Sequence, residues 1–209
     1  MINADLHIHS NHSDGKSSVR KIIEAAIAKG LKVISITDHD TVNGSLEALE
    51  IVREENLPIV VVRGVEISTA QGHLLAYGID KDIDEGIDLV EAVEIVKKLG
   101  GITSLAHPFQ FYRHGACKLR FFKIVDCIEI LNARSPPAFN TLSNYFRKRY
   151  SKGITAGSDA HKAKFVGKGI VVLENAINEK SILNALKNGQ CTVKGELSIR
   201  NFFWRIWFA

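Results

Sequence analysis

A chain of 209 residues, 45% of them hydrophobic, is long enough to bury one sizeable core, so a single domain is the simplest expectation. Its net charge of +4 is mild and its basic residues are spread out, which suits an anionic ligand but does not require nucleic acid. The three cysteines are odd in number and lack CxxC spacing, and no apolar run is long enough to cross a bilayer. We therefore expect a cytoplasmic protein with no disulfide framework and no membrane partner.

Short apolar runs rich in β-branched residues alternate with segments of helical period along the chain. The runs predict strands at 1–4, 32–37, 59–65, 72–78, 102–106, 127–131, 154–156 and 169–173. The periodic segments predict helices at 19–29, 41–56, 83–99, 138–150 and 179–187, the first of them capped by Ser17 or Ser18. Such alternation is typical of an α/β fold with parallel strands.

Residue types that bind metals recur where the predicted strands end. His7 and His9 follow the first strand, and they face the same way because side chains alternate along a strand. Comparable positions after later strands hold Asp38, His39, Glu66, His107, Asp159 and His161, and His73 stands at the start of a strand. The carboxyl ends of parallel strands meet at one rim, so these groups should converge there. Imidazoles and carboxylates suit zinc, manganese or iron, and so many of them fit two or three ions that share a bridging carboxylate.

These motifs, in this order, resemble those of the PHP family, the polymerase and histidinol phosphatase superfamily of metal-dependent phosphoesterases. The matching stretches are Asp5-Leu6-His7-Ile8-His9-Ser10 with Ser13-Asp14-Gly15, Ile36-Thr37-Asp38-His39-Asp40, Gly64-Val65-Glu66, Gly72-His73, Ala106-His107-Pro108 and Gly157-Ser158-Asp159-Ala160-His161. The resemblance implies a distorted (β/α)7 TIM-like barrel, which we place at 1–195, with an aromatic and basic tail at 196–209. It also implies a cluster of three divalent metal ions (Zn, Mn or Fe).

The ligands of these ions are likewise implied by the resemblance. His7, His9, Glu66 and Asp159 match the ligands of one ion, Glu66 with His73 and His107 those of a second, and Asp14, His39 and His161 those of the third. Asp14 rests on the resemblance alone. His12 lies in the same loop, but we leave it out because the family usually has a non-ligand at that position.

The implied reaction is hydrolysis of a phosphate ester of a small metabolite or nucleotide by a water that the metal ions activate. Asp38 and Asp40 flank His39, and either one orients a ligand imidazole or caps the helix that begins near Thr41. Arg134 follows a strand at the same rim, where a guanidinium suits a phosphate. The alternative for Arg134 is a surface position or a salt bridge to Glu129.

The sequence departs from some relatives in two places. They insert a cap domain between the positions of His73 and His107, whereas here that interval holds one helix and short loops, which predicts a more open site. The loop that carries Arg113 and His114 resembles a lid over this site. The stretch 200–208 is basic and aromatic, which suits a partner surface or a homo-oligomer interface, or else a helix that closes the bottom of the barrel.

Two other functions stay open. An exonuclease that trims oligonucleotide ends would need stacking platforms, for which Phe109, Phe111 and Tyr112 are candidates. A non-catalytic metal-binding regulatory module is the other alternative. It is disfavoured because a chain that had lost activity would be expected to lose ligands, and this chain keeps all of them.

Overall fold

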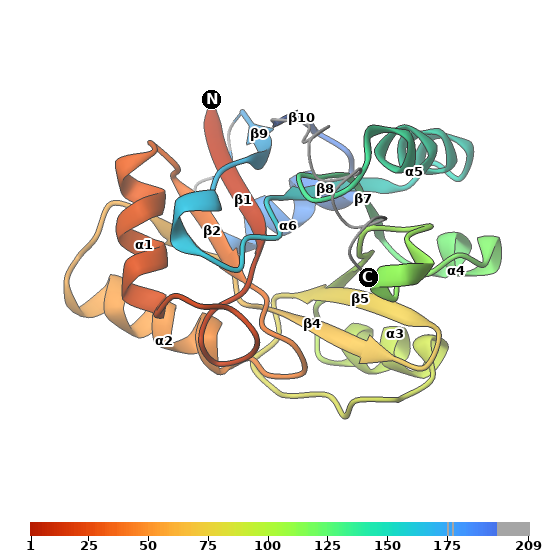
Figure 1. Ribbon diagram of the computed structural model, residues 1–209, viewed down its shortest axis with the longest axis horizontal. Coiled ribbons are helices and arrows are strands. Elements are labelled where there is room, and N and C mark those ends of the chain that lie inside the picture. Colours follow the sequence, from red (N-terminus) through yellow and green to blue (C-terminus); the bar gives the residue numbers. More distant parts are fainter. Residues whose placement is uncertain (175, 177, 196–209) are drawn as a thin grey trace, which may run out of the picture.

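The computed structural model describes residues 1–174, 176 and 178–195, and the strands lie at the centre with the helices outside them (Figure 1). The strands are β1 (Ile2–Ile8), β2 (Val33–Ile36), β3 (Val60–Val61), β4 (Gly64–Thr69), β5 (Gly72–Tyr77), β6 (Ile102–Leu105), β7 (Cys127–Asn132), β8 (Gly153–Gly157), β9 (Gly169–Leu173) and β10 (Cys191–Gly195). The helices are α1 (Val19–Ala28), α2 (Asn43–Glu54), α3 (Leu89–Lys98), α4 (Leu119–Ile124), α5 (Pro137–Arg149) and α6 (Glu179–Lys187). The predicted tail at 196–209 lies outside the described residues.

Most predicted elements are present, with four main differences. The first strand runs to Ile8 and not to residue 4, so His7 lies inside it. The predicted strand 59–65 is two strands, β3 and β4, so Glu66 lies inside a strand and not after one. The helix predicted at 83–99 begins only at Leu89, because Asp88 caps it by accepting a hydrogen bond from the Val90 amide. Helix α4 and strand β10 were not predicted. The Ser18 cap of α1 is confirmed.

The strands form two five-stranded sheets, ordered β10-β9-β1-β2-β3 and β4-β5-β6-β7-β8. The expected parallel arrangement is wrong for several pairs: β9 runs antiparallel to β1 and β10, and β5 runs antiparallel to β4 and β6. Only Ala70 and Gln71 separate β4 from β5, and so short a connection forces an antiparallel pair. Single bridges, Ile8 to Ala160 and His39 to Glu66, link the sheets. The described strands therefore confirm a mixed α/β fold of two linked sheets, while the (β/α)7 barrel stays what the resemblance implies.

A shared apolar core lies between the two sheets. Leu6 of β1, Tyr77 of β5 and Val171 of β9 belong to it, and Ile182 and Leu186 of α6 complete it. The Tyr77 hydroxyl donates a hydrogen bond to the Leu6 carbonyl across this core, at 2.9 Å. Helices α1 and α2 lie beside β1 and β2, and α3 lies beside β4 and β5 (Figure 1). None of the helices in the described ranges combines the length and apolar character needed to span a bilayer.

Candidate metal centre

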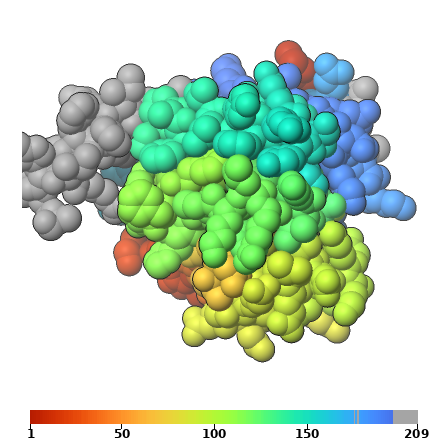
Figure 2. Space-filling view, turned by 90° about the vertical axis from the view of Figure 1, so that its right-hand side faces the viewer, coloured from red at the N-terminus to blue at the C-terminus, as the bar shows by residue number. Residues whose placement is uncertain are grey.

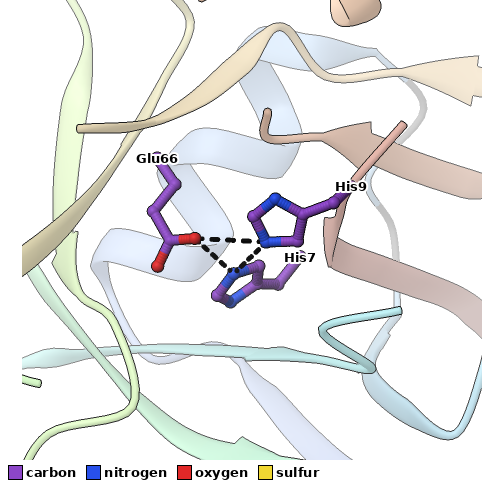
Figure 3. A group of neighbouring side chains, drawn as sticks. All are labelled: His7, His9 and Glu66. Atoms are coloured by element: carbon purple, nitrogen blue, oxygen red, sulfur yellow. Dashed lines mark hydrogen bonds and ion pairs between the residues drawn. The ribbon is translucent and has the colours of Figure 1, made fainter. Parts of the chain in front are cut away.

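Three side chains from two strands converge on one buried point at the rim (Figure 3). His7 is in β1, His9 lies just beyond it, and Glu66 is in β4. The Nε2 atoms of the two histidines lie 3.1 Å apart, and each is 3.1 Å from Glu66 Oε2. Ligand atoms about 2.1 Å from a common metal ion are separated by roughly 3.0–3.4 Å, so this triangle has the dimensions of a metal-binding face. The expectation that His7 and His9 face the same way is confirmed.

The second oxygen of Glu66 faces two further imidazoles. Glu66 Oε1 lies 3.1 Å from His73 Nδ1 and 3.1 Å from His107 Nε2. His39 approaches from the loop after β2, with its Nδ1 3.7 Å from Oε2. Because each oxygen of this one carboxylate faces a different pair of imidazoles, Glu66 stands between two sets of donor atoms. This is the arrangement that a carboxylate bridging two ions requires.

A third group of donors lies on the other side of His9. Asp14 Oδ2 is 2.9 Å from His161 Nε2, and Asp14 Oδ1 is 3.6 Å from His9 Nδ1. Asp159 Oδ1 lies 3.5 Å from His161 Nδ1 and 3.6 Å from His9 Nε2. Gly15 allows the Asp14 loop to approach, because a Cβ at that position would lie only 2.3 Å from the His9 carbonyl oxygen.

All nine predicted ligands fall into four overlapping groups whose donor atoms lie within 4.8 Å of one another. The groups are His7, His9 and Glu66; His7, His107 and Asp159; His9, Asp14 and His161; and His39, Glu66 and His73. These groups differ in part from the sets that the resemblance implies. His39 lies with Glu66 and His73, whereas the resemblance pairs it with Asp14 and His161.

The donor chemistry of this cluster fits divalent metal ions. Within the described ranges, three of its buried ring nitrogens have no hydrogen-bond partner, namely Nδ1 of His9, of His39 and of His107. Buried polar atoms in proteins are nearly always partnered, so three exceptions in one cluster indicate groups that serve another purpose. Neutral imidazole nitrogens together with carboxylate oxygens are the ligands that zinc, manganese and iron accept.

Electrostatics keep the acids of this cluster ionised despite their burial. Burial by itself would raise the pKa of Glu66, but His7, His73 and the hydrogen bond from His107 hold it well below its usual range. The pKa of Asp159 is likewise held low against burial, mainly by Arg113 and His7. Burial lowers the pKa of His39 and of His107, which favours their neutral rings. At His7 and His73 burial acts in the same direction, but the neighbouring carboxylates outweigh it and raise the pKa, so metal binding at these two rings would displace a proton. Charged oxygens and neutral imidazoles are the protonation states in which these side chains bind metals.

Asp38 and Asp40 contact the loops that surround His39. The Asp38 carboxylate accepts hydrogen bonds from the Ser10 amide (2.7 Å), the Ser10 hydroxyl (2.6 Å) and the Ser13 hydroxyl (2.6 Å). Asp40 accepts a hydrogen bond from the Ser68 amide at 2.6 Å. Helix α2 begins at Asn43 with no side-chain cap, so the alternative that these acids cap it is wrong. They fasten the loop after His9 and the loop after β2 to their neighbours.

Arg134 and Arg113 both reach Asp159. Arg134 Nη1 lies 3.0 Å from Asp159 Oδ1 and 2.9 Å from His161 Nδ1, so neither the surface position nor the salt bridge to Glu129 describes it. Arg113 pairs with the other oxygen of Asp159. The ring of His114, in the same loop as Arg113, stacks on His73 at a centroid distance of 5.5 Å.

His12, which the prediction excludes from the ligands, turns away from the other histidines. Its Nε2 pairs with Glu47 on α2, and His12 belongs to none of the four donor groups. The loop between β1 and α1 therefore contributes Asp14 to the cluster and directs His12 to the helix beside it.

Sequence reasoning missed Glu129, which is buried in β7. Its Oε1 lies 2.9 Å from His7 Nδ1, and its Oε2 accepts hydrogen bonds from the His107 amide (2.7 Å) and from Asn132 Nδ2 (3.2 Å). A carboxylate on the far ring nitrogen orients a histidine ligand and fixes its tautomer. The available signal was a lone acid inside the apolar run 127–131, because a buried charge needs partners.

The backbone is strained at three rim residues. Asp40, His107 and Asp159 have φ angles of 57°, 28° and 52°, a region that costs non-glycine residues of the order of 1–3 kcal/mol each. Backbone hydrogen bonds join two of these turns to site residues, from the Asp40 amide to the Glu66 carbonyl and from the Asp159 amide to the His7 carbonyl. Strain held in this way is common where side chains must be aimed at a functional centre.

Comparisons with known proteins agree with the motifs and the geometry. A family model described as PHP-associated matches residues 137–191. An uncharacterized protein of Methanocaldococcus jannaschii is 32% identical over 145 residues, which cover 62% of this chain and 81% of that protein. The 3',5'-nucleoside bisphosphate phosphatase of Chromobacterium violaceum is 36% identical over 84 residues, 38% of this chain and 29% of the phosphatase.

A solved structure is similar over most of the fold. It is a two-domain protein of Bacteroides vulgatus that contains a predicted PHP-like metal-dependent phosphoesterase, and it superposes with a TM-score of 0.78 at 19% identity. The match covers 93% of this chain and 65% of that one, so the chain spans about two thirds of its length. The motif order, the family match and the shared fold lead to one conclusion: the chain belongs to the PHP family.

Proposed function

We propose that this protein is a metal-dependent phosphoesterase that hydrolyses a phosphate ester of a small metabolite or nucleotide at a site for three divalent ions. The observation that carries the proposal is the position of Glu66, whose two oxygens each lie 3.1 Å from two different histidine nitrogens. A buried carboxylate with imidazoles on both oxygens is suited to a multinuclear site of the kind used for phosphoester displacement.

The nine clustered side chains are the ligands in this proposal: His7, His9, Asp14, His39, Glu66, His73, His107, Asp159 and His161. Bound divalent ions would supply Lewis-acid stabilisation of charge and would make a water acidic enough to lose a proton near neutral pH. Glu129 holds the ring of His7 so that its Nε2 faces Glu66. Arg134 stands beside Asp159 and His161 with a third of its side chain exposed, which suits a guanidinium that binds the substrate phosphate.

Asp38 and Asp40 have a positioning role in this proposal. Asp38 fixes the loop between His9 and Asp14 through Ser10 and Ser13. Asp40 fixes the loop of His39 to β4, next to Glu66. Neither carboxylate has to move a proton for the reaction, so their loss should act through metal binding.

The similarity to a 3',5'-nucleoside bisphosphate phosphatase supports a phosphorylated nucleoside as the substrate class. One observation favours the exonuclease alternative: Phe111 and Tyr112 are 77% and 51% exposed in the loop that carries Arg113. Phe109 does not belong to such a platform, because it packs against Phe122 and Phe146. The non-catalytic alternative gains no support from a cluster that keeps all nine donor side chains.

The test is metal counting combined with a substrate screen. Protein purified with Mn²⁺ or Zn²⁺ should bind about three equivalents and hydrolyse p-nitrophenyl phosphate, its bis-ester or a nucleoside bisphosphate. Release of single nucleotides from a short oligonucleotide would favour the exonuclease instead. Full metal loading without turnover of any of these compounds would reject the phosphoesterase.

A matched pair of variants distinguishes an effect on the metal site from a general effect of removing an acidic side chain. Glu66→Gln keeps the shape of the side chain but removes the charge between the two donor sets, so more than one metal equivalent and nearly all activity should be lost. Glu47→Gln makes the same change on the exposed partner of His12 and should leave both unchanged. Equal metal content in the two variants would show that Glu66 does not bridge.

A further inference from the structure

The basic residues are spread along the chain, but acidic residues are scarce in one segment, which therefore has a high net charge. Residues 111–152 contain nine Lys and Arg against two Asp and Glu, a net +7, although the whole chain carries only +4. Both acids of the segment are engaged elsewhere: Glu129 is buried at the metal centre, and Asp126 pairs with Lys187 at 2.9 Å. The outward surface of this segment is therefore basic, while the rest of the chain is slightly acidic.

Helices α4 and α5, which carry many of these cations, lie on the face that Figure 2 shows in green and teal. We call it the α4–α5 face and define it by Arg120, Lys123, Tyr145, Lys148, Arg149 and Lys152. The two helices are held together beneath it by ring contacts of Phe122 with Phe146 and Tyr150. Lys152 also donates a hydrogen bond to the Lys123 carbonyl. The two helices that carry these cations are therefore packed against each other.

The cations of this face have no acidic partner among the residues that the structure describes. Within the described part of the chain, none of its five Lys and Arg side chains forms an ion pair with a carboxylate. Two cations outside the segment are matched in this way, Arg20 with Glu55 and Arg63 with Glu179. Like charges gathered without counter-charges repel one another, and a polyanion relieves that repulsion while releasing its own counterions.

Exposed aromatic rings accompany the charge. Tyr145 on α5 is 60% exposed, and Phe111 and Tyr112, in the loop that carries Arg113, are 77% and 51% exposed. The Tyr112 ring contacts that of Phe139 in the first turn of α5, at a centroid distance of 6.3 Å. Helix α5 starts at the rim, just after β7, and its 13 residues run about 20 Å to the basic last turn. That length is roughly six stacked nucleotides.

We propose that the α4–α5 face binds single-stranded nucleic acid. The phosphates lie on Lys148, Arg149 and their neighbours, and a base stacks on Tyr145. Cations beside exposed rings are what sequence-tolerant binding of a single strand requires, because phosphates and base faces are present in every strand. The strand then leads along α5 toward Phe111 and Tyr112 at the rim. This binding needs no metal ion, so it can be tested independently of the proposed phosphoesterase activity.

The test is fluorescence anisotropy of the full chain with labelled oligouridylate of about 12 nucleotides, with and without EDTA. Lys148→Glu/Arg149→Glu should weaken binding at least tenfold and lower the slope of log affinity against log salt by about 1.4, because each contact to a single strand contributes about 0.7. Tyr145→Ala should weaken binding about fivefold or more. The double variant Arg53→Glu/Lys81→Glu makes the same charge change at exposed positions outside the segment and should stay within twofold of the parent.

Other outcomes would overturn the proposal. Equal weakening by the α4–α5 variant and by the control variant would show a general charge effect with no dedicated surface. Binding to phosphatidylserine vesicles that is lost in Lys148→Glu/Arg149→Glu, with no oligonucleotide binding by the parent, would assign the face to an anionic membrane instead. Circular dichroism of each variant checks that it is folded, and Tyr145→Ala, which removes only an exposed ring, keeps the test valid if the charge variants unfold.

Discussion

Glu129 and His7 lie 122 residues apart in the sequence, and Glu129 Oε1 lies 2.9 Å from His7 Nδ1 in the interior of the protein. When His7 binds a metal ion as a neutral ring, this contact sets its tautomer, because the nitrogen beside the carboxylate keeps the proton and the other nitrogen offers its lone pair. That other nitrogen, Nε2, is the one 3.1 Å from Glu66. Glu129 therefore acts on the metal centre through a histidine, without contacting the point where His7, His9 and Glu66 meet.

We expect Glu129→Gln to lower metal affinity about 10- to 100-fold, since the amide still fits but no longer fixes the proton on Nδ1. Competition with a chromophoric chelator measures the affinity. Glu47→Gln serves as the control because it alters an exposed acid that pairs with His12, outside the cluster. An affinity equal to that of the parent would show that burial of His7 alone sets its orientation.

The candidate ligands were predictable because each stands in a short motif at a chain position that the fold brings to the rim. His7 and His9 needed only the alternation of a strand. Glu129 was not predictable in the same way, because a pattern of burial does not say which distant side chain it will face. Arg134 was predicted as a rim residue, but its contact with Asp159 depends on how β7 and β8 pair, which the sequence does not state.

The sheets show the same limit. Strand positions follow from apolar runs, but strand direction follows from the connections. The connection Ala70-Gln71 is not one of the pairs, such as Asn-Gly or Gly-Gly, that are typical of two-residue hairpins. The antiparallel pairing of β4 with β5 was therefore not predicted. Strand β10 was missed because Cys191–Gly195 is only five residues long and none of its residues is fully buried.

Arg134 is expected to act on substrate binding. Arg134→Gln should raise the KM for a phosphate monoester about tenfold or more, because a hydrogen bond between charged groups is worth roughly 1.5–3 kcal/mol. Metal content should remain that of the parent. Steady-state kinetics and metal analysis of the same preparation test this, with Arg53→Gln as the control at an exposed helix position. Loss of metal with unchanged KM would instead make Arg134 a support for Asp159 and His161.

Gly157 is expected to be essential for the metal centre, although it carries no side chain. A Cβ at this position would lie 2.2 Å from the Cβ of His7 and 2.7 Å from its backbone nitrogen, so the clash is with backbone that has little room to relax. Gly157→Ala should lower the free energy of unfolding by about 1–3 kcal/mol and reduce metal content. Gly86→Ala is the control, since it strains a positive φ of 75° in open space and should keep the metals. Denaturant titration and metal counting distinguish the two.

Asp126 is expected to contribute an acid-sensitive part of the stability. Burial raises the pKa of Asp126, but the hydrogen bonds from Lys187 and Thr103 outweigh it, and the net pKa is lowered. A carboxyl whose folded pKa lies below its unfolded value of about 3.9 stabilises the fold above that pH and loses this contribution as the pH falls through the folded pKa. Asp126→Asn should therefore lower the free energy of unfolding by about 1 kcal/mol at pH 7 and by much less near pH 3. The effect at pH 7 is small because Lys187 is half exposed, so solvent weakens the ion pair. Urea unfolding at both pH values measures the difference, with Asp84→Asn as the control at an exposed position. An equal loss of stability at both pH values would assign the effect to packing around Thr103 instead of charge.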